Sequence, residues 1–194
     1  MPGQTTDPPS TQQTLTLQQA IDLAVQHHTA GEFTQAESIC RQILEAHPDQ
    51  PQALHLLGVI AHQRGENEQA VTLIEKALSI KSDYAEAHSN LGLVLQELGK
   101  LEDAVSSYRL ALDLNPDYAE AHCDLGVVFI ELGRFDEAGE CYQRAIAIQS
   151  NYFEAIYNLG NLLQERGKLK DAVRVFSKAI TIKPYDVDAA NNLG

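Results

Sequence analysis

Tryptophan is absent from this sequence, and aromatic residues make up only 6% of it. Large globular cores usually draw much of their buried area from aromatic side chains, so this composition favours stabilisation by many small contacts. Cysteine is also scarce, since three occur and no two have the Cys-x-x-Cys spacing. An odd number of cysteines without that spacing is typical of a reducing compartment, and we therefore expect a cytoplasmic protein.

Long apolar runs and clustered positive charge are missing as well. The longest apolar stretch, residues 56–61, is far too short to cross a membrane. The first residues have neither the basic start nor the apolar run of a signal peptide. The 14 lysines and arginines are scattered, and the formal net charge of −13 repels phosphate backbones. We therefore expect neither a membrane nor nucleic acid as a partner.

What the sequence does contain is a repeat. Residues 85–100 and 119–134 agree at ten of sixteen positions, at an offset of 34. A leader, residues 1–16, precedes the repeats, and its Pro, Thr and Gln content predicts flexibility. The period divides the rest into units 17–50, 51–84, 85–118, 119–152 and 153–186, with a partial sixth unit, 187–194. Below, the place of a residue is its position within its unit.

Each unit reads as a helix, a turn and a second helix. In the third unit, apolar residues within 91–98 recur at the three- and four-residue spacing of a helical face. Gly99, at the fifteenth place, predicts the left-handed residue that ends this helix. A second apolar face follows, and Pro116 ends it because its ring cannot continue a helix.

Small residues recur at two further places. The eighth place is Gly in every unit but the first, and the twentieth place is Ala. In the third unit these residues are Gly92 and Ala104, which we expect to lie where the two helices cross, because minimal side chains let backbones approach closely. Gly costs up to ~1 kcal/mol relative to Ala inside a helix, so its recurrence indicates a packing requirement.

Together these features resemble the tetratricopeptide repeat, which has a Leu-Gly pair, a turn glycine, a central alanine, an aromatic column and a terminal proline. Here the aromatic column, at the twenty-fourth place, reads Cys40, Ile74, Tyr108, Tyr142 and Phe176. The resemblance covers residues 17–194. It implies an all-α fold, a right-handed superhelix (α-solenoid), in which the first helix of each unit lines the concave side.

The sixth place, just before the Leu-Gly pair, is polar from the third unit onward. It holds Asp22, Leu56, Asn90, Asp124, Asn158 and Asn192. We expect this place to face the groove, where a row of amides binds the backbone of an extended peptide, since an amide both donates and accepts hydrogen bonds. The alternative is that these side chains are solvated or bond the neighbouring unit.

The Asn-Leu-Gly context also resembles the N-terminal repeats of bacterial proteins similar to O-linked N-acetylglucosamine transferase. In that family the asparagines form a ladder along the inside of the superhelix and grip protein substrates. The resemblance implies the same role for Asn90, Asn158 and Asn192, with Asp124 as a variant. We add Asn161, from the same predicted helix as Asn158, to this peptide-binding surface.

The distribution of charge restricts the class of ligand that we expect. Every Lys and Arg of the repeats falls at the fourteenth place or later, whereas acids recur at the second and thirteenth places. The helix dipole explains acids at the second place, but not Glu97 and Glu131 at the thirteenth, which we assign to the binding surface. Tetratricopeptide domains that hold acidic chaperone tails use Lys and Arg on these faces. The predicted partner is therefore a neutral or basic protein segment.

No catalytic motif accompanies these features. The sequence has no GxxxxGK[ST], no HExxH and no strand followed by GxGxxG. Cys123 is expected on the groove side without a His or acid to activate it. His28 and His62 lack the spacing of metal ligands, and His88 and His122 are expected to face the core. We predict no cofactor, no metal and no catalysis by this chain.

Two functions compete. The first is a non-catalytic interaction module, and the second is the substrate-recognition arm of an O-GlcNAc transferase-like glycosyltransferase, or another transferase, with its catalytic domain beyond residue 194. The partial sixth unit favours a fragment of a longer chain. The alternative is self-association through an uncapped C-terminal end, because solenoids need their ends capped.

Overall fold

The computed structural model describes residues 15–183, which form ten α-helices and no strand. The helices are α1 (Leu17–Thr29), α2 (Phe33–Ala46), α3 (Pro51–Gln63), α4 (Asn67–Ile80), α5 (Ala85–Glu97), α6 (Leu101–Leu114), α7 (Ala119–Glu131), α8 (Phe135–Ile148), α9 (Phe153–Glu165) and α10 (Leu169–Ile182). Each predicted unit from residue 17 to residue 183 therefore contributes one pair of helices.

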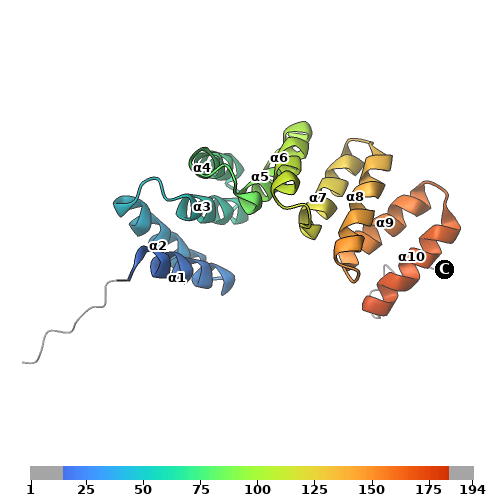
Figure 1. The fold of residues 1–194 in the computed structure, drawn as a ribbon, viewed down its shortest axis with the longest axis horizontal. Helices are drawn as coiled ribbons and strands as arrows, with labels where there is room; N and C mark the ends of the chain where they lie inside the picture. Colours follow the sequence, from blue (N-terminus) through green and yellow to red (C-terminus); the bar gives the residue numbers. More distant parts are fainter. Residues whose placement is uncertain (1–14, 184–194) are drawn as a thin grey trace, which may run out of the picture.

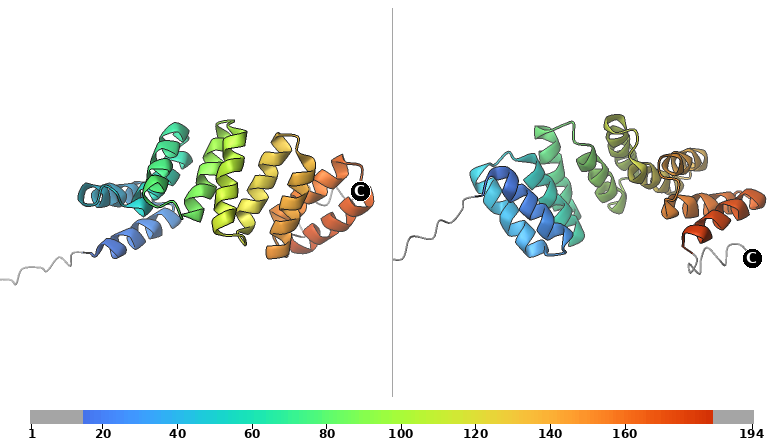
Figure 2. Two further views of the ribbon diagram at one scale, coloured as in Figure 1. Left: turned by 45° about the horizontal axis from the view of Figure 1, so that its top comes forward. Right: turned by 60° about the horizontal axis from the view of Figure 1, so that its bottom comes forward.

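The helix pairs stack side by side into an arch (Figures 1 and 2). Each odd-numbered helix packs on the even-numbered helix that follows it, and each even-numbered helix packs on the next odd-numbered one. The odd-numbered helices also contact one another in succession, from α1 to α9. They form a continuous surface, which we call the inner face. The chain is an all-α solenoid of helical hairpins, as the repeat predicts.

Glycine ends the first helix of every unit in the same way. In the third unit, Gly99 has a φ of +72°. Its N–H donates to the carbonyl of Gln96, and the N–H of Lys100 donates to the carbonyl of Leu95. This is the Schellman motif, which requires a left-handed residue that glycine adopts without strain. Positive φ recurs at Gly31, Gly65, Gly133 and Gly167.

A glycine against a large side chain sets the distance between the two helices of a unit. A Cβ atom added to Gly92 would lie 2.8 Å from Cε2 of Tyr108, and one added to Gly126 would lie 2.6 Å from Cε1 of Tyr142. The three atoms nearest to the added Cβ of Gly92 all belong to Tyr108. The close approach is as predicted, and the Tyr108 ring occupies the space that a larger residue at position 92 would need.

The first unit makes this contact with a different pair of residues. Ala24 replaces the glycine and Cys40 replaces the large side chain, and both are buried. Because Cys is smaller than a ring, it leaves room for the methyl group of Ala24. Cys40 serves as a small apolar side chain, and burial, aided by the charge of Glu37, raises the pKa of its thiol to about 12.

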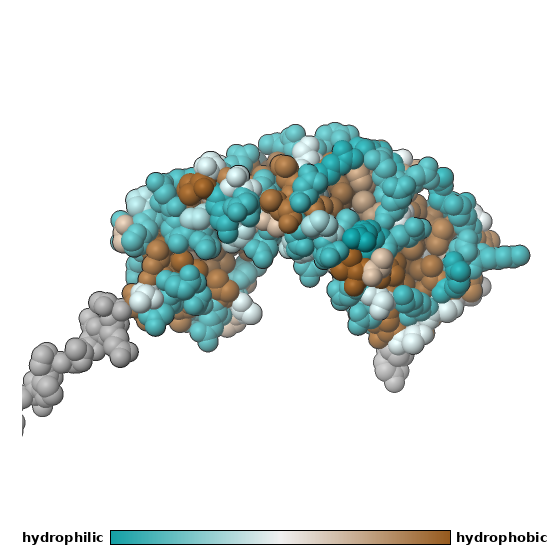
Figure 3. Space-filling view, viewed as in Figure 1, coloured by the Kyte–Doolittle hydropathy of each residue, from teal (hydrophilic) through white to brown (hydrophobic). Residues whose placement is uncertain are grey.

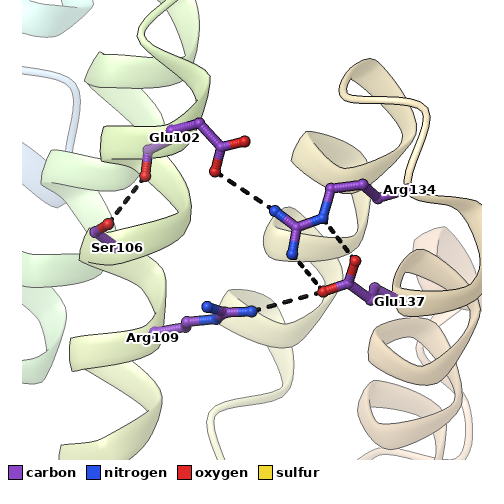
Figure 4. Close-up of polar contacts among 5 residues, drawn as sticks. All are labelled: Glu102, Ser106, Arg109, Arg134 and Glu137. Atoms are coloured by element: carbon purple, nitrogen blue, oxygen red, sulfur yellow. Dashed lines mark hydrogen bonds and ion pairs between the residues drawn. The ribbon is translucent and has the colours of Figure 1, made fainter.

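Arginines join the third and fourth units through ion pairs between α6 and the start of α8 (Figure 4). The guanidinium of Arg134 pairs with Glu137 and also reaches Glu102 of α6 at 3.4 Å. It lies over the ring of Phe129, 4.5 Å from the ring centroid. Arg109 of α6 forms a further ion pair with Glu137 at 3.6 Å. Exposed ion pairs contribute only ~0–1 kcal/mol each to stability. Their main effect is that the guanidinium groups of Arg109 and Arg134 are already paired with acids of their own chain.

An unfilled space lies between the fourth and fifth units. The twenty-first place is Val71, Val105 and Val173 in three units but Gly139 in the fourth. A hollow of about 240 Å³ lies there between α8 and α9, with Gly139 and Leu162 among its lining residues. The missing valine side chain leaves this space unfilled.

The end of the stack formed by α10 exposes apolar side chains. Leu169 and Val173 are 60% and 44% exposed. The predicted sixth unit, which would begin at residue 187, lies outside the described residues.

We expect Gly126→Ala and Gly139→Ala to change stability in opposite directions. Both glycines lie inside helices, where Ala is favoured by ~1 kcal/mol. The new Cβ at position 126 would overlap the Tyr142 ring, whereas at position 139 it would lie 3.5 Å from Cδ2 of Leu162, an ordinary contact. Urea unfolding should show a loss of ~1–3 kcal/mol for Gly126→Ala and a gain of up to ~1 kcal/mol for Gly139→Ala. Equal effects would contradict the packing described above.

Candidate functional site

The inner face carries an apolar stripe between two rows of carboxylates. The stripe is formed by the ninth place, where Val59, Leu93 and Val127 are half-buried. Exposed acids flank it, namely Glu86, Glu120 and Glu154 at the second place and Glu97, Glu131 and Glu165 at the thirteenth. In the space-filling view of Figure 3, the arch encloses a hollow between its two ends. A surface of this kind can hold an extended chain against apolar groups with acids on both sides.

Asn90 is bonded to the preceding unit. Its Nδ2 lies 2.8 Å from Nε2 of His55, and Nδ1 of His55 lies 3.0 Å from the hydroxyl oxygen of Tyr84. With the Asn90 amide as donor, the neutral imidazole accepts at Nε2 and donates from Nδ1. Burial, with a smaller effect of His28, lowers the pKa of His55 to about 4, which keeps the ring neutral. The structure therefore favours the interpretation that this amide bonds the neighbouring unit.

Asn158 repeats the arrangement with a weaker partner. Its Nδ2 lies 4.0 Å from Sγ of Cys123, which occupies the same place in its unit as His55. Cys123 was predicted on the groove side, but it is only 3% exposed. It lies behind Asn158, and burial, followed by the charge of Asp124, raises the pKa of its thiol to about 12.

Asp124 is the member of this row that lacks a partner. No hydrogen bond or ion pair joins its carboxylate to another residue within 15–183, although the side chain is half-buried. Burial, and to a lesser extent the charge of Glu120, raises the pKa of Asp124 to about 6. Replacing Asn by Asp at this place thus leaves a partly desolvated charge on the inner face.

The acids of the thirteenth place are not neutralised by Lys or Arg. Glu97 accepts a hydrogen bond from Asn67 and lies 3.5 Å from Nδ1 of His62, and Glu131 accepts one from Gln96. The ion pairs that the described residues form with Lys or Arg involve other acids, mostly on even-numbered helices and turns. Glu154 at the second place is the inner-face exception, since it pairs with Lys183 at 3.1 Å.

A hollow of about 210 Å³ opens on the inner face between α7 and α9. Its lining combines apolar, amide and acidic side chains, namely Val127, Ile130, Tyr142, Asn158, Asn161, Leu162 and Glu165. The structure thus brings Asn158 and Asn161 together, whereas Asn192 lies outside the described residues. The sequence pattern places Glu165 in the same row as Glu97 and Glu131, although only the latter two were assigned to the binding surface.

Two histidines predicted in the core bond the backbone of the loop before their helix instead. His88 and His122 are half-buried and point Nε2 at the carbonyls of Ser82 and Pro116, both at 3.0 Å, so they cap preceding loops rather than fill the core as predicted. Residues 15–183 contain no group of three or more His, Cys, Asp or Glu side chains placed to hold a metal ion. Among the same residues, no helix has the length and hydropathy that spanning a membrane requires.

Profiles of the tetratricopeptide repeat match residues 17–42, 58–99, 83–151 and 117–184. The chain belongs to the tetratricopeptide repeat family. No curated protein sequence matches it significantly.

Solved tetratricopeptide structures share the fold. The crystal structure of MamA is 26% identical, covers 86% of this chain and 98% of its own, and has a TM-score of 0.75. PilF of Pseudomonas aeruginosa is 22% identical, covers 86% and 76%, and has a TM-score of 0.81. YrrB is 23% identical, covers 89% of each chain, and has a TM-score of 0.72. These likenesses support the stacked architecture of the tetratricopeptide repeats.

Asp124→Asn should stabilise this tetratricopeptide domain at neutral pH. The pKa of Asp124 is about 6 in the folded chain and 3.8 in the reference state, so the folded state holds the charge less favourably above pH 6. We expect a gain of ~1–3 kcal/mol at pH 7 that shrinks as the pH falls through 6 and vanishes near 4. Urea unfolding across this range measures it, and Asp22→Asn, at the same place but exposed, is the control.

His55 should make the domain sensitive to acid. Its pKa is about 4 when folded and 6.5 in the reference state, so the unfolded chain binds the proton first as the pH falls. The stability that neutral His55 contributes is present above pH 6.5 and is lost towards pH 4, by ~3 kcal/mol. His55→Gln keeps a hydrogen-bonding side chain that does not titrate. The free energy of unfolding of this variant should therefore decrease less steeply between pH 6.5 and pH 4. Identical pH profiles of wild type and variant would contradict this assignment.

Proposed function

We propose that the inner face binds an extended, neutral or basic segment of a protein partner. The tetratricopeptide fold supports a protein–protein interaction module in general. The observation that carries the finer proposal is the apolar stripe of Val59, Leu93 and Val127 between carboxylates that Lys and Arg leave largely unpaired. An extended chain presents side chains alternately, so apolar ones meet the stripe and cationic or polar ones meet the acids.

Two further observations support a peptide ligand. The hollow between α7 and α9 is about 210 Å³, a size suited to one side chain, and it contains Asn158, Asn161 and Glu165 beside apolar walls. The related structure of YrrB is described as that of a TPR protein with an unusual peptide-binding site. In this proposal Asn161, Glu97 and Glu131 face the bound segment, while Asn90 supports the surface by bonding His55.

The recognition arm of a glycosyltransferase stays a prediction, as does self-association through the α10 end of the stack. Neither bears on how the inner face binds a segment. The proposed activity of this chain is binding without turnover.

Binding should depend on the stripe and not on apolar residues elsewhere. The ligands are twelve-residue peptides selected on the wild type from a random displayed library. We expect the double variant Leu93→Gln with Val127→Gln to bind them with at least ~10-fold lower affinity, because each change replaces an apolar contact by a polar group. The matched control is Leu110→Gln with Leu114→Gln on α6, where both side chains are 44–49% exposed. Fluorescence anisotropy measures affinity, and circular dichroism checks helicity. Peptides that bind both variants equally well would refute the proposal.

A further inference from the structure

Asp124 breaks a pattern that its neighbours in the row keep. Asn90 bonds His55 and Asn158 contacts Cys123, in each case across one junction between units. The residue of the third unit that corresponds to His55 and Cys123 is Ser89. It is buried and is hydrogen-bonded to the Tyr118 hydroxyl instead of to Asp124. Asp124 therefore has the position of a bonded residue without the bond.

A second polar group without a partner lies within electrostatic range of Asp124. The hydroxyl of Tyr108 is buried, has no hydrogen-bond partner, and belongs to a side chain that is 0% exposed. Among the ionisable groups around Tyr108, the charge of Asp124 raises the pKa of this tyrosine most, ahead of Tyr118, Cys123 and Glu131. Leaving a buried hydroxyl unpaired is unfavourable, so the interior near Asp124 holds a second polar group whose hydrogen bonding is unsatisfied.

The charged and titratable surroundings of Asp124 offer it no cation. Glu120 and Cys123 come from its own helix, Tyr108 from α6 and Tyr142 from α8, and Tyr118 and Tyr152 precede α7 and α9. None of these groups is basic. A half-buried carboxylate without a cation nearby is stabilised most strongly by a positive charge that a ligand brings.

We infer that Asp124, with the Tyr108 hydroxyl behind it, receives a cationic side chain of the bound protein segment. The inference rests on the proposed function and names the residue class that its ligand must carry. A guanidinium or ammonium group donates to the carboxylate, and the alkyl stem of Arg or Lys packs along the apolar stripe. Glu120 adds long-range attraction for the same charge.

Binding should be coupled to loss of the Asp124 proton. Because a cation binds the ionised carboxylate, the bound segment lowers the pKa of Asp124, which is about 6 in the free chain. The carboxylate is then about nine-tenths ionised at pH 7 and about one-tenth at pH 5. Affinity for a cationic segment should therefore fall about 10-fold between these pH values, through this residue alone.

The test uses pools of twelve-residue peptides, random except for a central Arg, Lys, citrulline or norleucine. At pH 7 the wild type should bind the Arg and Lys pools at least ~10-fold more tightly than the citrulline pool, which has a neutral side chain of similar shape. Asp124→Asn should lose this preference, together with its dependence on pH between 5 and 7. Asp113→Asn, which changes an exposed carboxylate on α6 outside this row, should keep both.

Each outcome decides one of the two proposals. If the pools bind and Leu93→Gln with Val127→Gln weakens them, but Asp124→Asn keeps the preference for cations, this inference is overturned while the proposed function stands. If no pool binds the wild type, the proposed function fails and the inference fails with it. Titration of the Asp124 side-chain carbon by NMR gives an independent readout, since its pKa should fall when the Arg pool is added and stay unchanged with the citrulline pool.

Discussion

Everything in this tetratricopeptide domain depends on how closely the two helices of a unit approach, and a large side chain against a glycine sets that distance in the second to fifth units. Tyr108 lies against Gly92 and Tyr142 against Gly126, with no room for a methyl group. The contact buries a large apolar area at the point where side chains would otherwise separate the backbones. Because it recurs every 34 residues, it also fixes the orientation of each first helix and so creates a continuous inner face.

Charge is partitioned between the surfaces that result. Arginines such as Arg134 and Arg166 pair with acids at the junctions, away from the stripe. Inner-face carboxylates such as Glu131 and Asp124 are left without a fixed positive charge, and Asp124 is held at the expense of stability. Residues that destabilise a folded chain in this way are those for which a binding role is the natural explanation.

The sequence was sufficient for the fold because periodicity, turn glycines and terminal prolines all indicated the same unit. It was not sufficient for the side chains of the inner face. The pattern placed Asn90 in a binding row, but the proximity of His55, 35 residues earlier, decides that its amide bonds the neighbouring unit. Likewise, Cys123 is buried rather than groove-facing, and Asn158 of the next unit lies 4.0 Å from its sulfur. Such pairings depend on the superhelical offset between units, which no single repeat encodes.

The glycine at position 139 has a consequence for how the domain comes apart. A solenoid is held by interfaces between neighbours only, so a defect in one of them weakens the coupling between the units on either side. The unfilled space of about 240 Å³ between α8 and α9 forgoes dispersion contacts that a valine side chain supplies elsewhere. Amide protons of α9 and α10 are therefore expected to exchange through a local opening that leaves the preceding helices intact, so that protection decreases stepwise along the chain rather than disappearing at once.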